Sequence, residues 1–323
     1  TEYMPGRNRG TWSSRVSFIG NWSYPLCSLI AMGLTPLISA EWNWRVQLLI
    51  PAILSLIATA LAWRYFPESP RWLESRGRYQ EAEKVMRSIE EGVIRQTGKP
   101  LPPVVIADDG KAPQAVPYSA LLTGVLLKRV ILGSCVLIAM NVVQYTLINW
   151  LPTIFMTQGI NLKDSIVLNT MSMFGAPFGI FIAMLVMDKI PRKTMGVGLL
   201  ILIAVLGYIY SLQTSMLLIT LIGFFLITFV YMYVCYASAV YVPEIWPTEA
   251  KLRGSGLANA VGRISGIAAP YAVAVLLSSY GVTGVFILLG AVSIIVAIAI
   301  ATIGIETKGV SVESLSIDAV ANK

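Results

Sequence analysis

Long apolar segments alternate with short polar segments along most of the chain. A run of about 20 predominantly apolar residues is long enough to cross a bilayer as a helix. The pattern predicts eight such spans, at 12–39, 44–66, 130–157, 164–187, 195–213, 216–242, 256–280 and 282–304. A soluble core rarely needs so many runs of this length. The predicted fold class is therefore an all-α, polytopic membrane protein.

One long polar segment, residues 67–129, separates the second span from the third. Its first part places apolar residues at helical spacing over 79–93, which predicts a short amphipathic helix. The stretch that follows, GKPLPPVVIADDGKAPQAVP, is rich in proline and typical of a linker. We therefore expect the end of one helix bundle at 1–66, a central loop at 67–129, a six-helix bundle at 130–304 and a tail at 305–323.

The composition agrees with a membrane location and excludes several classes of function. The chain is 56% hydrophobic and 13% charged, and it contains no histidine. Soluble domains typically carry about 25% charged residues. Without histidine, neither a Ser-His-Asp triad nor a histidine-bearing metal site can form within this chain. The three cysteines lie in predicted spans and form no CxxC pair. We expect neither an enzyme nor a bound cofactor.

The net charge of +7 reflects orientation in the membrane. When the eight spans are threaded in alternation, every Lys and Arg except Arg45, Lys163 and Arg263 falls on one side. This positive-inside pattern predicts that the N-terminus of the chain, the central loop and the C-terminus are cytoplasmic. The expected partners are the bilayer and a small molecule, and not a nucleic acid.

Two charged segments far apart in the chain repeat one another. TEYMPGRNRG, at 1–10, and PEIWPTEAKLRG, at 243–254, each place a Pro three residues after a Glu and end on a basic residue, a gap and Arg-Gly. Both precede a span. This arrangement predicts two parallel repeats related by an axis along the membrane normal. The second repeat has six spans and its motif precedes the fifth, so we expect four further spans before Thr1 and twelve in the intact protein.

The segments PESPRWLESRGRYQEAEKVM, DKIPRK, PEIWPTEAKLRGSGLANAVGRISGIAAPY and IETKGVSVESL together resemble the major facilitator superfamily, in the branch of sugar porters, aromatic-acid symporters and organic-ion transporters. The resemblance implies a twelve-helix alternating-access carrier of the bacterial inner membrane, with a central polar cavity and, commonly, proton-coupled uptake. One departure is Pro191 in DKIPRK, where the family usually has glycine. Because proline fixes φ and lacks an N–H donor, we expect an altered turn with the motif's charges retained.

Charged residues at the ends of the spans are candidates for a gate. Opposite charges there can pair when one side of a carrier closes and separate when it opens, which makes a two-state element. The candidates in the second half are Asp188, Arg192, Glu244 and Arg253, and their counterparts in the first half are Glu2, Arg9, Glu68 and Arg71. The alternative is that these charges only set the topology and solvate helix ends.

Arg263 is the one charged residue well inside a predicted span. A charge at this depth is costly, so its side chain should face a cavity or a partner. It is a candidate for binding an anionic or polar substrate, and the alternative is a snorkelling or structural role. Gly262 and Gly266 form a GxxxG pattern beside it, which favours close helix packing.

The third span carries a second candidate for substrate binding, because amides and aromatic rings recur along one face at helical spacing. Its residues are Asn141, Gln144, Tyr145, Asn149 and Trp150, and weaker candidates in other spans are Asn21, Tyr24, Tyr236 and Asn259. Hydrogen bonds between helices or an interfacial aromatic belt explain these residues equally well. No Asp or Glu lies in the interior of a span, so a residue for proton coupling is expected elsewhere.

The leading hypothesis is a secondary active transporter for a small polar organic metabolite, such as a sugar, polyol or organic acid. It is expected to work as a monomer, with a proton as the co-transported ion. The alternatives are a transporter-like sensor that does not transport, and a facilitator or antiporter without proton coupling.

Overall fold

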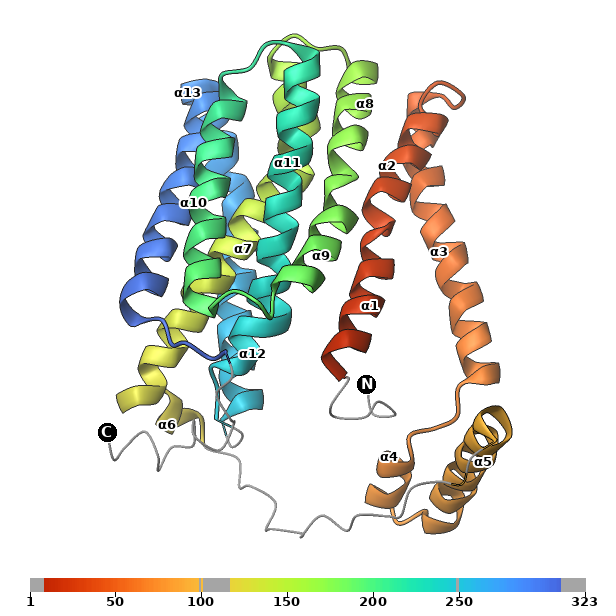
Figure 1. Ribbon diagram of the computed structural model, residues 1–323. Coiled ribbons are helices and arrows are strands. Elements are labelled where there is room, and N and C mark those ends of the chain that lie inside the picture. Colours follow the sequence, from red (N-terminus) through yellow and green to blue (C-terminus); the bar gives the residue numbers. More distant parts are fainter. Residues whose placement is uncertain (1–8, 99, 101–116, 248–249, 309–323) are drawn as a thin grey trace. The chain divides into compact units, whose positions relative to one another are not determined.

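The computed structural model describes residues 9–98, 100, 117–247 and 250–308, with the backbone alone for 9–14 and for Ala40, Arg71, Trp72 and Ser75. All regular structure in these ranges is helical (Figure 1). The helices are α1 (Arg9–Asn21), α2 (Ser23–Leu34), α3 (Ala40–Tyr65), α4 (Pro70–Ser75), α5 (Tyr79–Thr97), α6 (Tyr118–Leu121), α7 (Gly124–Thr157), α8 (Leu162–Met173), α9 (Gly175–Val186), α10 (Arg192–Ser211), α11 (Met216–Val234), η2 (Cys235–Tyr241), α12 (Val242–Glu244) and α13 (Lys251–Ile303).

Seven of the eight predicted spans correspond to membrane-length helices of the described chain. In the described part of the chain, six continuous segments are long and apolar enough to cross a membrane: Glu41–Tyr65, Gly124–Thr157, Leu162–Val186, Arg192–Ser211, Met216–Glu244 and Lys251–Ile303. The last of these contains two predicted spans, because Gly281 has φ 66° and ψ −161° and divides α13. A conformation with positive φ is readily available only to glycine. The first predicted span corresponds to α1 and α2, which a turn at Trp22 separates.

The chain divides into two units. One unit contains α3, α4 and α5, and the other contains α1, α2 and the helices from α6 to α13. The second unit thus joins residues 7–37 to 113–323. The domain division expected from the sequence, with boundaries after 66, 129 and 304, stays a prediction.

In the first unit, α5 is the amphipathic helix expected in the central loop. Ala82 is its buried position, and Arg87 pairs with Glu83 on its exposed side at 2.6 Å. The helix ends at Gly98, which has φ 64° and caps it in the left-handed conformation. The short helix α4 packs against α5 and buries Leu73. The membrane-length helix α3 has no buried residue in its apolar stretch.

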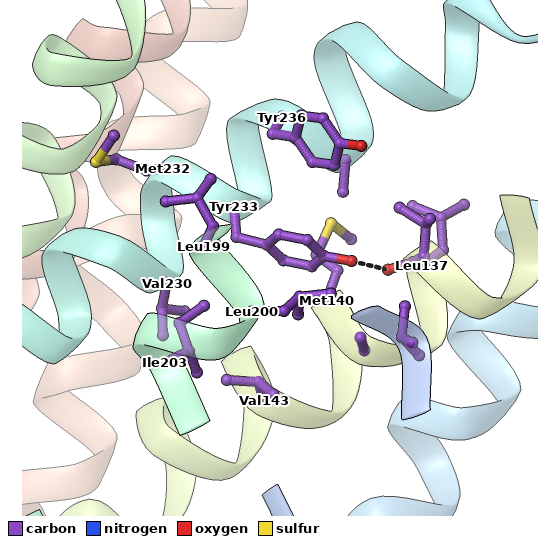
Figure 2. Close-up of a cluster of buried hydrophobic side chains, with 14 of the residues drawn as sticks. Leu137, Met140, Val143, Leu199, Leu200, Ile203, Val230, Met232, Tyr233 and Tyr236 are labelled. Atoms are coloured by element: carbon purple, nitrogen blue, oxygen red, sulfur yellow. Dashed lines mark hydrogen bonds between the residues drawn. The ribbon is translucent and has the colours of Figure 1, made fainter. Parts of the chain in front are cut away.

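The second unit is a helix bundle built around α7. In α7, 67% of the most apolar stretch is buried, more than in any other membrane-length helix of the described chain. The two halves of α13 lie along α7 and α10, and α11 packs against α9 and α10 (Figure 1). Leu137 of α7, Leu200 of α10 and Val230 of α11 belong to one continuous core (Figure 2). The helices α1 and α2 pack on α9 and α8.

The span that begins with α11 changes its helical type before it ends. Residues Cys235–Tyr241 form a π-helical turn, η2, and α12 continues the span to Glu244. π turns are rare and occur frequently at functional sites. The turn therefore brings Tyr236, Tyr241 and Glu244 into positions that a helical wheel of the sequence does not give.

Candidate functional site

A set of charged groups gathers around Arg192, the first residue of α10. Its Nε and Nη2 atoms donate to the two carboxylate oxygens of Glu244 on α12, at 3.1 and 3.2 Å. Nη2 also donates to Asp188 Oδ1 at 3.2 Å, and Nη1 donates to the backbone carbonyl of Met187. The Arg192 side chain is only 7% exposed. Charge-assisted, bidentate bonds of this kind are stronger than hydrogen bonds between neutral groups.

The residues that follow α13, 304–308, tie the last span to this set, and we call them the strap. Glu306 Oε1 accepts hydrogen bonds from the backbone N–H groups of Arg192 at 2.8 Å and Lys308 at 3.1 Å. Glu306 Oε2 accepts from the N–H of Lys193 at 3.1 Å. Thr307 Oγ1 donates to Glu244 Oε2 at 2.6 Å. Asp188, Arg192, Glu244, Glu306 and Thr307 together form what we call the Arg192 network.

The Glu306 carboxylate occupies the amino end of α10. The first N–H groups of a helix have no partner within the helix, and the helix dipole favours a negative charge there. Although partial burial acts to raise the pKa of Glu306, the backbone N–H donors at Arg192, Lys193 and Lys308 lower it below its usual value. Glu306 therefore remains ionised at neutral pH and holds the strap against α10.

The network contains three of the predicted gate residues, Asp188, Arg192 and Glu244. Arg253 is placed differently, because its guanidinium lies over the ring of Tyr118, 5.2 Å from the centroid. The carboxylate of Glu244 is instead bound by Arg192 and by the strap. The pairing of these charges agrees with the expectation that the motif around Pro191 keeps them.

Pro191 itself has φ −56° and ψ 139° and directly precedes α10. Its missing N–H donor costs little there, because the first N–H groups of a helix are not needed for its internal hydrogen bonds.

The predicted gate residues of the first half cannot be placed in this network. Glu68 lies in the unit of α3 to α5, and its Oε1 accepts a long hydrogen bond of 3.4 Å from the N–H of Ser69. Glu2 and the side chains of Arg9 and Arg71 lie outside the described residues.

Sequence reasoning missed Glu306 and Thr307 as members of the network. The available signal was the position of IETKG directly after the last predicted span. The partner of Glu306 is 113 and 114 residues away at Lys193 and Arg192, and no local pattern reveals such a pairing. Only the packing of α13 along α10 brings the two segments together.

Arg263 of α13 meets the polar face of α7. Its Nη1 donates to the hydroxyl of Tyr145. The Arg263 side chain is exposed, and no carboxylate among the described residues pairs with it. The other N–H groups of its guanidinium are therefore available to a ligand.

The GxxxG pattern of α13 is the contact surface for α7, as the sequence predicted. A Cβ atom at Gly262 would lie 2.8 Å from Leu137 Cβ, and one at Gly266 would lie 2.9 Å from the ring of Tyr145. Asn141 lies in this contact and is 2% exposed. Its Nδ2 donates to the backbone carbonyl of Leu137 at 2.7 Å, and its Oδ1 has no partner among the described residues. Asn141 therefore faces the neighbouring helix.

The other substrate-binding candidates are spread over the second unit. In α7, Gln144 and Trp150 are half-buried and Asn149 is exposed, whereas Asn259 of α13 is exposed one turn before Arg263 and donates to a carbonyl of its own helix at 2.9 Å. Asn21, at the end of α1, also donates to a carbonyl of its own helix, at 2.7 Å. In α2, the ring of Tyr24 lies edge-on to that of Tyr231 in α11, 5.1 Å between centroids.

Three tyrosines, Tyr233, Tyr236 and Tyr241, form a buried tyrosine column along η2. The ring of Tyr236 lies 5.7 Å from that of Tyr233 and is stacked 5.0 Å from that of Tyr241. Tyr233 donates its hydroxyl to the carbonyl of Val136 on α7 at 3.1 Å (Figure 2). Tyr241 exchanges two hydrogen bonds with the backbone of Ile305 in the strap, at 3.0 and 3.1 Å.

Tyr236, a candidate for substrate binding, is buried within this column. Its side chain is 0% exposed, since the stacked rings of the column enclose it. The π turn directs it inward, and a regular helical wheel of the sequence does not show this.

Over residues 1–270 the sequence matches the Major Facilitator Superfamily. The chain belongs to this family. It is 44% identical over 318 residues to the inner membrane metabolite transport protein YdjE of Escherichia coli strain K12, which covers 98% of this chain and 70% of that protein. It is 24% identical over 318 residues to the niacin transporter NiaP of Acinetobacter baylyi, with 98% and 70% of the two chains covered.

Solved structures show the same fold. The E. coli xylose transporter XylE in a partially occluded, inward-open conformation matches with a TM-score of 0.68 at 19% identity, over 96% of this chain and 66% of that one. The proton:xylose symporter XylE bound to 6-bromo-6-deoxy-D-glucose matches with a TM-score of 0.62 at 22% identity, over 97% and 68%. The family match and the helical structure of the described residues confirm the expected family and fold class: the chain is an all-α, multi-pass member of the superfamily.

Proposed function

We propose that the protein is a secondary active transporter that moves a small polar organic metabolite across the bacterial inner membrane by alternating access. The observation that carries this proposal is the Arg192 network, which joins the ends of four separate segments in a carrier fold. The relatives YdjE and NiaP are named as transport proteins, and YdjE is named as one of the inner membrane. The lipid bilayer and the cargo are the proposed partners of a monomer.

The Arg192 network suits a gate on the cytoplasmic side. It contains a nearly buried guanidinium with several charged partners, whereas a single exposed ion pair contributes only about 0–1 kcal/mol. Its members come from the turn after α9, from α10, from α12 and from the strap. The bonds therefore form together when these segments meet and are lost together when they part. The positive-inside pattern of the sequence supports a cytoplasmic location of these segments.

Arg263 supports an organic acid as the cargo. An arginine inside a membrane span with free N–H groups can bind a carboxylate bidentately. Asn259 lies one turn away on α13 and is exposed, so it can add an amide contact. One relative is named as a transporter of niacin, which is a carboxylic acid, and this supports the same class. A neutral sugar or polyol is the competing class, as in the xylose and arabinose symporters.

Proton symport is the proposed mode of coupling, because named relatives in the family are proton symporters. The spans of this chain carry no Asp or Glu in their interior, so their own residues supply no coupling carboxylate there.

The experiment that tests the proposal is uptake by the purified full-length protein in proteoliposomes. Radiolabelled nicotinate, D-xylose and L-arabinose are offered with and without an inward proton gradient, and empty liposomes serve as the control. We expect accumulation of nicotinate above its external concentration, abolished by a protonophore. Failure of every compound to enter, with or without a gradient, contradicts the proposed function. Uptake that ignores the gradient contradicts proton symport alone.

A further inference from the structure

The π turn η2 lies between two anchored points. Before the turn, Tyr233 is fixed to the backbone of α7 through its bond to the carbonyl of Val136. At its end, Tyr241 is fixed to the strap by two hydrogen bonds to Ile305. Three residues after Tyr241, Glu244 holds Arg192. The tyrosine column is thus a direct physical connection between α7 and the Arg192 network.

The backbone hydrogen bonds of η2 can change from the π-helical to the α-helical pattern. The N–H of Val242 bonds to the carbonyl of Ala237, five residues earlier, where an α-helix would use the residue four earlier. The hydroxyl of Ser238 donates to the carbonyl of Val234 at 2.7 Å. A π turn can therefore exchange its hydrogen bonds for those of an α-helix one residue at a time. The Ser238 hydroxyl keeps the carbonyl of Val234 paired during such an exchange.

Tyr236 places a buried hydroxyl group beside α10. Its hydroxyl is buried and has no hydrogen-bond partner in the described chain. It abuts α10 at Gly196, where a Cβ atom would lie 2.4 Å from the hydroxyl oxygen. Gly196 is one helical turn beyond Arg192. Buried hydroxyl groups without partners are unfavourable and uncommon, so another arrangement of η2 that pairs this group would gain stability.

We propose that η2 is a switch between the Arg192 network and α7: when the network opens, the π turn shifts by one residue, and the Tyr236 hydroxyl gains a partner in the shifted state. This inference rests on the proposed alternating-access function. It assigns to the tyrosine column the role of transmitting the state of the gate to the helix that carries the polar face of the bundle.

The chain supplies its own reporter. Cys135, next to Val136 on α7, is partly buried and packs against the core that contains the column. In the full-length protein, every other cysteine except the buried Cys235 of η2 is replaced by alanine. The rate of reaction of Cys135 with N-ethylmaleimide is then measured before and after Glu244→Gln, which removes the charge that pairs with Arg192. We expect this substitution to change the rate by about fivefold, in the range of typical coupling between two sites.

Deletion of Ala239 tests whether the Cys135 response to Glu244→Gln passes through the π turn. Ala239 is an exposed residue of η2, and removing one residue converts a π turn into an α-helix while both anchors keep their register. We expect Cys135 to stop responding to Glu244→Gln in this variant, and transport turnover to fall about tenfold or more. Ala239→Ser, which keeps the length of the turn, is the matched control and should respond as the unchanged protein does.

If the protein that lacks Ala239 does not fold, a second variant tests whether η2 is a switch. Tyr236→Phe removes the hydroxyl that gains a partner in the shifted state, so it should reduce both turnover and the Cys135 response. Tyr210→Phe is its control, because Tyr210 also has a buried hydroxyl without a partner among the described residues but lies outside the column. It should leave both readouts unchanged.

The inference is overturned if Cys135 does not respond to Glu244→Gln in the unchanged protein. It is also overturned if the response survives both deletion of Ala239 and Tyr236→Phe, or if Tyr210→Phe acts as strongly as Tyr236→Phe. The cysteine readout needs no cargo. Failure of the proposed transport would appear separately, as absence of uptake by the unchanged protein.

Discussion

At the scale of single residues, two arginines of the second unit are used in different ways. Arg192 is 7% exposed, and its guanidinium is bound by Glu244 and Asp188. Arg263 is exposed, and its described partner is the neutral hydroxyl of Tyr145. A guanidinium whose donors are already occupied serves structure, whereas one with free donors in a membrane bundle can bind an anion. Tyr145 is then a positioning residue, because it fixes the direction of the guanidinium.

Replacing Tyr145 by phenylalanine tests this role. Tyr145→Phe keeps the ring against Gly266 but removes the hydrogen bond to Arg263. We expect KM for an acidic cargo to rise about tenfold or more with kcat little changed, as for the loss of one hydrogen bond to a charged group. Uptake kinetics in proteoliposomes measure the two constants.

Tyr271→Phe on α13, where the side chain is 74% exposed, is the control and should leave KM unchanged. Arg263→Gln should abolish saturable uptake of the acid. An unaltered KM in Tyr145→Phe, or undiminished acid uptake in Arg263→Gln, contradicts the assignment.

At the scale of elements, the contact between α7 and α13 depends on two glycines. Gly262 and Gly266 let the first half of α13 approach α7 so closely that an added Cβ would meet Leu137 and Tyr145 at less than van der Waals distance. In a membrane, such small-residue contacts replace the hydrophobic effect as a source of helix association. The same approach brings Arg263 to Tyr145, so packing and the binding site share one interface.

Gly262→Ala should therefore destabilise the bundle. Its Cβ would lie 2.8 Å from Leu137 Cβ and 3.3 Å from the Leu137 carbonyl carbon, which cannot move without shifting α7. Overpacking of this kind costs about 1–3 kcal/mol. Gly256→Ala, on the same helix with nothing within 4 Å of the added atom, is the matched control. Thermal unfolding in detergent measures both, and equal stability of the two variants would show that the contact is not close.

At the scale of the whole molecule, the second unit is held at one end by bonds between segments far apart in the chain. The strap reaches the amino end of α10 through Glu306 and reaches Glu244 through Thr307. The Nζ of Lys308 adds a bond to the carbonyl of Lys189 at 2.7 Å. Because Glu306 acts as an anion at a helix amino end, its contribution depends on pH.

The sign of that dependence follows from the lowered pKa of Glu306 in the folded protein. A carboxylate with a depressed pKa stabilises the fold fully above its unfolded-state pKa, and this stabilisation is lost as the pH falls through the folded-state value. We expect Glu306→Gln to lower the thermal midpoint at pH 7, and this deficit to shrink as the medium is acidified below the ordinary range of a glutamate.

Thermal unfolding of the unchanged protein and Glu306→Gln over a series of pH values measures the effect. Glu90→Gln, at an exposed position on α5, is the control and should cause no pH-dependent difference. A deficit that stays constant down to acidic pH would mean that the charge of Glu306 plays no part.

The sequence by itself determined the spans, the amphipathic helix of the central loop and the family. Each of these depends on local properties: the length of apolar runs, the spacing of side chains along a helix, and the order of short motifs. It even located the division of α13, because the predicted spans end and begin on either side of Gly281. It also named Asp188, Arg192 and Glu244, because charges at helix ends are visible in a linear pattern.

Only the tertiary structure decided which groups meet. It paired Glu306 with the amino end of α10, more than one hundred residues away in the chain. It placed Arg253 over Tyr118 instead of in the network, and it buried Asn141 and Tyr236 between helices. It also revealed the π turn, whose extra residue redirects the side chains after Val234. These outcomes depend on how helices pack against one another, and packing is set by contacts between distant segments that no local pattern records.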